Sequence, residues 1–250
     1  MKQKFNYSAL VASVLLGSVI VLVFSWISGN TFAAALFPTL TLLSGFIITG
    51  FIIGIITKEI TILEPGLGAI IVSAIVWWLL PAFELHGFFG IWTTDWLIIF
   101  MNAIVLTFVG AWLGEKFQHG AVESANSTTP SIEWSWILAG TFLGVTCSVI
   151  LVNILVLILG ANPSVFYIPF FVVLLCIGLV VGWKSPGVTI KEAGIAGFLT
   201  ITINYDIIRL TLYNDTEMQL SYIIGGLILG FIVTWLGGWV GEKIQARKGS

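Results

Sequence analysis

The chain has 250 residues, of which 58% are hydrophobic and only 9% are charged, and its formal net charge is −2. An average soluble domain carries about 25% charged residues, so this composition excludes an ordinary water-soluble globule and favours a protein whose apolar side chains face lipid. The small net charge gives no reason to expect a nucleic-acid partner.

The first apolar run, Ala9–Ser25, follows Lys2 and Lys4 and resembles a signal peptide with a cleavage region near Thr31–Ala35. Two observations oppose that interpretation. The run exceeds the hydrophobic region of a signal peptide, which is about 7–15 residues long, and the second half of the chain holds an equivalent segment. We therefore expect a mature membrane helix here.

Eight segments have the apolar composition and roughly the 20-residue length of a membrane-spanning helix. In chain order they are Tyr7–Ile27, Ala33–Thr57, Leu63–Leu80, Thr94–Gly114, Trp134–Leu159, Val165–Trp183, Ala193–Leu212 and Leu220–Val240. The sequence thus predicts an all-α, polytopic membrane protein of about eight transmembrane helices. We expect a four-helix repeat at 1–118, a cytoplasmic linker at 119–132 and a second four-helix repeat at 133–250.

The basic residues give the expected orientation. If the N-terminus is cytoplasmic and all eight segments span, nine of the ten Lys and Arg residues fall on the cytoplasmic side and only Arg209 falls outside. This distribution is the positive-inside bias, and a different helix count would scramble it. The tryptophans fall near the two membrane boundaries. With short loops and no organellar targeting segment, we expect a prokaryotic plasma membrane with both termini cytoplasmic.

The two halves match at an offset of 127 to 128 residues. Phe108–Gln118 aligns with Trp235–Gln245, and Gly50, Gly54 and Glu64 align with Gly178, Gly182 and Glu192. Because each half has an even number of spans, both copies enter the membrane in the same direction. The sequence therefore predicts a parallel tandem duplication, in contrast to an inverted repeat.

Two Thr-x-x-Glu patterns begin the third and seventh segments, Thr61–Glu64 and Thr189–Glu192. The pattern fits a capping box, in which the Glu reaches back to the Thr backbone N–H. The functional alternative is a symmetric pair of carboxylates, Glu64 and Glu192, lining a cation or proton path.

Glycine pairs at four-residue spacing let another helix backbone approach closely, so we expect them to pack helices, with a dimer interface or a gate as alternatives. They are Gly50/Gly54, Gly110/Gly114, Gly178/Gly182, Gly226/Gly230 and Gly237/Gly241.

The seventh segment carries a polar cluster, Asn204-Tyr205-Asp206 with Arg209, where the first half has Val76-Trp77-Trp78 and Pro81. Asp206 and Arg209 are three residues apart and can form an ion pair on one helix face. Such a pair would lower the free-energy cost of placing the two charges in the membrane, so a purely structural role would explain the cluster. A contact with a solute or a partner is the alternative. Asn102 and Asn153 are the main other amides at depth, where interhelical hydrogen bonding is their usual use.

No nucleophile set, phosphate-binding loop or metal-ligand spacing is present, and Cys147 and Cys176 lie in apolar runs. We therefore expect no enzyme, cofactor or metal site.

The first functional hypothesis is a non-catalytic scaffold, assembly or accessory subunit that contacts the bilayer and another membrane protein or a second copy. The alternative is a small permease or channel for a proton or a weakly polar or lipid-like solute. Its path would lie between the repeats and be lined by Glu64, Glu192, Asn102, Asn153, Asn204 and Asp206.

Overall fold

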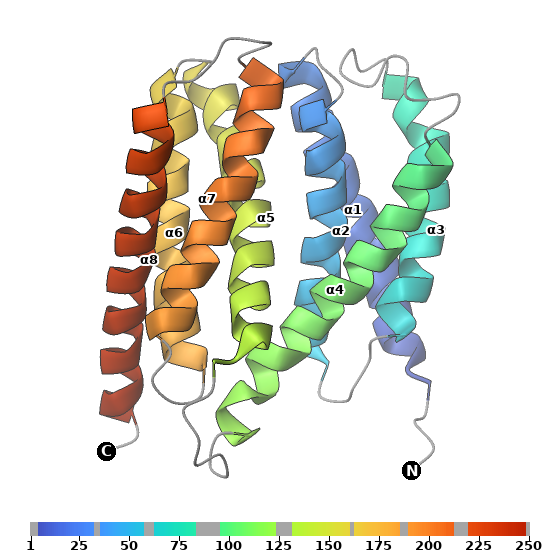
Figure 1. The fold of residues 1–250 in the computed structure, drawn as a ribbon. Coiled ribbons are helices and arrows are strands. Elements are labelled where there is room, and N and C mark those ends of the chain that lie inside the picture. Colours follow the sequence, from blue (N-terminus) through green and yellow to red (C-terminus); the bar gives the residue numbers. More distant parts are fainter. Residues whose placement is uncertain are drawn as a thin grey trace. The chain divides into compact units, whose positions relative to one another are not determined.

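The computed structural model describes residues 5–32, 36–57, 63–83, 96–123, 132–160, 163–185, 190–212 and 220–248, and every element in these ranges is helical (Figure 1). The helices are α1 (Tyr7–Thr31), α2 (Leu36–Ile56), α3 (Leu63–Leu79), the 3₁₀ turn η1 (Leu80–Phe83), α4 (Trp96–Glu123), α5 (Trp134–Leu159), α6 (Pro163–Lys184), α7 (Ile190–Leu212) and α8 (Leu220–Lys248).

Seven of the described helices are long and apolar enough to cross a membrane, as in a multi-pass membrane protein. The eighth long helix, α7, has 23 residues and is therefore long enough to cross a membrane, but it is not apolar enough to be counted with the other seven. The polar positions Asn204, Asp206 and Arg209 lie on it. The count of eight spans accordingly stays a prediction.

The chain divides into two compact units, Met1–Gln118 and His119–Ser250. In the first unit, α1 packs against α2 and α3, while α2 and α3 both contact α4. In the second unit, α5 packs against α6 and α7, and α8 packs against α6 and α7. The contacts place α1 parallel to α3, α2 to α4, α5 to α7, and α6 to α8.

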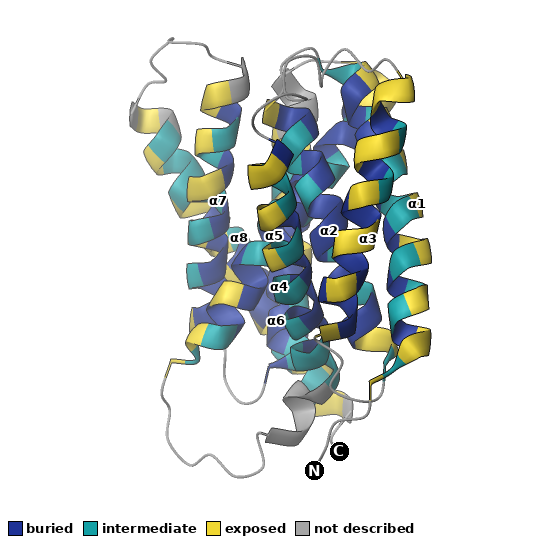
Figure 2. Cartoon of the chain, turned by 90° about the vertical axis from the view of Figure 1, so that its right-hand side faces the viewer, coloured by how far each residue is buried: buried dark blue, intermediate teal, exposed yellow. Residues whose placement is uncertain are grey.

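Helix α1 shows why these units suit a bilayer. The residues that it buries against its neighbours are small and recur every fourth position: Ala9, Ser13, Gly17, Val21 and Ser25. Its exposed positions are large and apolar, namely Val11, Leu15, Val19 and Val23. Figure 2 shows exposed residues recurring along α1 and α3 in the same manner. Small residues inside and large apolar residues outside are typical of helices that face lipid.

Glycines form close backbone contacts between helices in each unit. A Cβ added at Gly50 or Gly54 of α2 would meet the α4 backbone at Thr107 and Ala111, and one added at Gly114 would meet the backbone at Gly54. Gly110 faces the carbonyl of Ile47 in the same way. The α6–α8 pair repeats this arrangement with Gly178, Gly182, Gly237 and Gly241.

The remaining glycine pair behaves differently. A Cβ on Gly230 would meet the Ile201 side chain of α7, whereas a Cβ on Gly226 would meet nothing within 4 Å in the described structure. Gly226 is therefore not packed against a neighbouring helix within the described residues, in contrast to the other predicted packing glycines.

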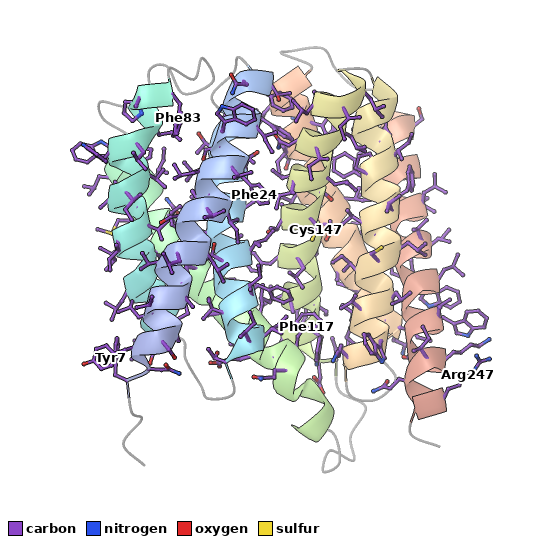
Figure 3. All side chains as sticks on the ribbon, turned by 180° about the vertical axis from the view of Figure 1, so that it is seen from behind. Tyr7, Phe24, Phe83, Phe117, Cys147 and Arg247 are labelled. Carbon is purple, nitrogen blue, oxygen red and sulfur yellow. The ribbon has the colours of Figure 1, made fainter. Side chains whose placement is uncertain are left out.

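Basic residues gather at one end of the second unit. Lys184 ends α6, Lys243 lies near the end of α8, and Lys191 is the second residue of α7. The Gln245 side chain donates a hydrogen bond to the Ser185 carbonyl at 3.1 Å. Lys243 Nζ lies 3.4 Å from the centre of the Trp239 ring, and Arg247 follows near the end of α8 (Figure 3). A Lys stacked on Trp is typical of a membrane–water boundary.

Candidate functional site

The two buried glutamates hold the starts of neighbouring helices. Glu64 Oε1 accepts a hydrogen bond from the backbone N–H of Asn6, the N-cap residue of α1, at 2.9 Å. In the second unit, Glu192 Oε1 accepts one from the backbone N–H of Glu133, the N-cap residue of α5, at 3.3 Å. Both glutamates are buried. Each carboxyl group thus satisfies an N–H at the start of the parallel neighbouring helix.

The expected capping boxes place the partners of these glutamates within their own helices. Thr61 and Thr189 lie outside the described residues, so that bond has no structural test. The contacts that are described join two helices of one unit instead. Glu192 Oε2 is buried and has no hydrogen-bond partner among the described residues.

The side-chain nitrogens of Asn102 and Asn153 both donate hydrogen bonds to backbone carbonyls of their own helices. The Nδ2 of Asn102 donates to the Ile98 carbonyl at 2.8 Å, and the Nδ2 of Asn153 donates to the Val149 carbonyl at 2.8 Å. Asn102 is exposed on α4, whereas Asn153 is buried on α5. Both side-chain nitrogens therefore bond within their own helices.

Asp206 and Arg209 are both exposed on α7. Their three-residue spacing allowed an ion pair, but within the described residues no ion pair joins them or involves either with another side chain. The self-paired interpretation of this cluster is therefore not what the structure contains. Two separate charges stand on the surface of a helix that is otherwise rich in apolar residues.

A column of buried polar side chains lies between α5 and α7. A Cβ on Gly140 would lie 2.9 Å from the Ala196 Cβ, and one on Gly144 would lie 2.6 Å from Thr200 Oγ1. Because the helices run parallel, the next step of four residues brings Ser148 level with Asn204. Thr200, Ser148 and Asn204 are 0%, 0% and 3% exposed.

Each member of this column has an unpartnered polar atom. Ser148 Oγ, Thr200 Oγ1 and Asn204 Nδ2 are buried without a hydrogen-bond partner among the described residues. Buried polar atoms are ordinarily paired, so three unpaired ones at one helix contact require an explanation. We call Ser148, Thr200 and Asn204 the polar column.

The first unit has valines at all three corresponding positions. At the 127- and 128-residue offsets, Ser148, Thr200 and Asn204 correspond to Val21, Val72 and Val76. The three valines are fully buried in one hydrophobic cluster of the first unit. The fold of one unit therefore holds with valines at these three positions, and the polar column is a feature of the second unit.

Sequence reasoning identified Asn204 but missed Ser148 and Thr200. Single hydroxyl residues are common in membrane helices and gave no signal individually. The signal was available in the internal repeat, because all three differences from valine fall on facing positions of α5 and α7.

Neither cysteine forms a disulfide: Cys147 on α5, labelled in Figure 3, and Cys176 on α6 are both free thiols. Among the described residues, no group of three or more His, Cys, Asp and Glu side chains is placed to hold a metal ion.

Comparison of the chain with protein-family models, with curated proteins and with solved structures gives no match.

Proposed function

We propose that this chain is a non-catalytic accessory or scaffold subunit of a membrane complex, and that α7 is its contact with the partner. The observation that carries the proposal is the exposure of Asp206 and Arg209 on α7 without an ion pair. A charged side chain within a membrane segment is costly unless it meets another polar group. A second membrane protein with complementary polar groups at the same depth would supply that pairing.

The alternative, a permease lined by the predicted polar residues, has less support. Glu64 and Glu192 accept hydrogen bonds from helix starts, and Asn102 and Asn153 donate to their own helices. These bonds occupy one carboxylate oxygen of each glutamate and the two amide nitrogens, which are therefore less suited to bind a passing solute or proton, whereas Glu192 Oε2 has no partner among the described residues.

The proposal includes eight spans in a prokaryotic plasma membrane, with both termini cytoplasmic and the two units related by duplication. Lys184, Lys191 and Lys243 at one end of the second unit support this orientation, with Arg209 near the opposite end. The matching Glu64–Asn6 and Glu192–Glu133 contacts support the duplication.

Site-specific photocrosslinking tests the proposed contact. A photoreactive residue at Leu210, which is 66% exposed, would sit beside Arg209, and one at Leu97, which is 67% exposed on α4, serves as an equally exposed position on another helix. The full-length protein is crosslinked in its native membrane, and adducts are identified by mass spectrometry and by reciprocal purification through the tagged partner.

We expect one defined membrane protein at Leu210 and not at Leu97, and we expect Asp206→Asn/Arg209→Gln to remove the adduct. Thr202→Val, also on an exposed position of α7, is the matched control and should leave it unchanged. An adduct that survives the double substitution, or none at Leu210, contradicts the proposal. An adduct of two copies of this chain assigns the face to self-association instead of a separate partner.

A further inference from the structure

Thr200 and Asn204 lack a backbone bond that most described threonines and asparagines of these helices make. Eight described threonines donate their hydroxyl to the carbonyl four residues earlier: Thr31, Thr41, Thr49, Thr57, Thr107, Thr141, Thr202 and Thr234. Asn30, Asn102 and Asn153 do the same with Nδ2. Thr200 Oγ1 and Asn204 Nδ2 make no such bond.

The two side chains are directed at the neighbouring helix. The position of a Cβ on Gly144 lies 2.6 Å from Thr200 Oγ1 and 2.8 Å from its Cγ2, so Thr200 occupies the space that Gly144 leaves on α5. Asn204 follows one turn later on the same face of α7 and is 3% exposed. The Thr200 hydroxyl therefore lies against α5, and Asn204 lies one turn further along that face, level with Ser148.

We propose that the polar column binds ordered water between α5 and α7, near the middle of these two helices. The groups present suit this ligand. The Asn204 amide supplies donors, and the Ser148 and Thr200 hydroxyls supply one donor and two acceptor positions each. A buried water makes about three hydrogen bonds to otherwise unsatisfied polar groups, which is the number of side chains gathered here.

The comparison with the first unit supports water as the occupant. Val21, Val72 and Val76 fill the corresponding space with methyl groups in one apolar cluster. In the column, Ser148 has a single hydroxyl where Val21 has two methyl groups, and Thr200 and Asn204 carry polar atoms where Val72 and Val76 carry only methyl groups. A charged ligand does not fit, because no described charged side chain belongs to the column.

Water-edited solid-state NMR of the full-length protein in lipid bilayers tests this assignment. Asparagine is labelled with ¹⁵N, and the transfer of magnetisation from water to each side-chain amide is followed in time. The Asn204 resonance is identified by its loss in Asn204→Val. Asn153, which is equally buried but bonded to Val149, is the internal control within α5.

We expect the Asn204 amide to gain signal from water several-fold faster than the Asn153 amide, and Ser148→Val to slow it toward the Asn153 rate. Ser73→Val, at a buried serine of α3 in the first unit, should leave the Asn204 rate unchanged. Equal rates of magnetisation transfer from water to Asn204 and Asn153 in the unmodified protein overturn the proposal. A direct Ser148–Asn204 hydrogen bond with no magnetisation transfer from water overturns it as well. The proposed subunit contact does not enter this measurement, so the two proposals fail separately.

Discussion

Glu64 Oε1 accepts a hydrogen bond from the backbone N–H of Asn6, with a distance of 2.9 Å between oxygen and nitrogen. The two residues are 58 positions apart in the sequence, so this bond joins the start of α3 to the start of α1. Asn6 in turn caps α1, because its side-chain oxygen accepts a hydrogen bond from the backbone N–H of Ala9 at 3.2 Å. Two helix starts therefore share one small hydrogen-bond network at an end of the first unit.

Replacing Glu64 should show what this network contributes. Glu64→Ala leaves the Asn6 N–H without its acceptor, and we expect the free energy of unfolding to fall by about 1–3 kcal/mol. Glu64→Gln retains a carbonyl oxygen and should lose less than half of that. Reversible denaturation in mixed micelles measures both variants. Equal losses for Ala and Gln would contradict a role for the acceptor at this position.

The α2–α4 contact predicts a large difference between two glycines. In Gly54→Ala the new methyl group would meet the Ala111 carbonyl and the Gly114 backbone, and backbone cannot move aside as a flexible side chain does. We expect a loss of about 1–3 kcal/mol or more in unfolding free energy.

Gly226→Ala is the matched control for that substitution, because its methyl group would meet nothing within 4 Å in the described structure. It should be neutral or should stabilise α8 by up to about 1 kcal/mol, since alanine is the better helix former. The same denaturation assay measures the unfolding free energies of both variants. Gly54→Ala as stable as Gly226→Ala would rule out the close backbone contact.

The valine cluster of the first unit should tolerate one polar residue poorly. In Val76→Asn, the new amide would lie beside Val21 and Val72, which offer no side-chain hydrogen bond. A buried polar group without a partner costs about 1–3 kcal/mol in protein mutational data. We expect a loss of stability in that range.

Transplanting the whole polar column gives the control for Val76→Asn. The triple change Val21→Ser/Val72→Thr/Val76→Asn introduces groups that satisfy one another or share water, so it should cost less than the sum of the three single changes. A strictly additive loss, measured by the same denaturation assay, would show that the column has no cooperative hydrogen bonding.

Four-residue spacing places Gly50 and Gly54 on one helix face, and both face the α4 backbone, whereas Gly226 has the same spacing from Gly230 and faces no described neighbour. The sequence did not predict which helix each glutamate would bind. A capping box is a pattern within one helix, whereas Glu64 and Glu192 bond to parallel neighbours that are far away in sequence. Spacing alone also allowed an Asp206–Arg209 pair, yet the directions of two side chains on one face are set by rotamers that sequence does not reveal.

Helix α7 explains why the span count needs a direct test. Its polar residues make it the least apolar of the long helices, although α5, α6 and α8 all pack against it. Sequence composition cannot decide between a span surrounded by other helices and a segment that only partly enters the bilayer.

Substituted-cysteine labelling in intact cells tests the two parallel four-helix repeats most directly. In a background with Cys147 and Cys176 replaced by alanine, single cysteines are placed at Lys58, Lys184 and Asp215 and are labelled with a membrane-impermeant reagent. The account predicts that Lys58→Cys and Lys184→Cys stay protected until the membrane is opened, whereas Asp215→Cys labels from outside. Lys58 and Lys184 in opposite compartments, or Lys184 and Asp215 in the same one, would contradict it.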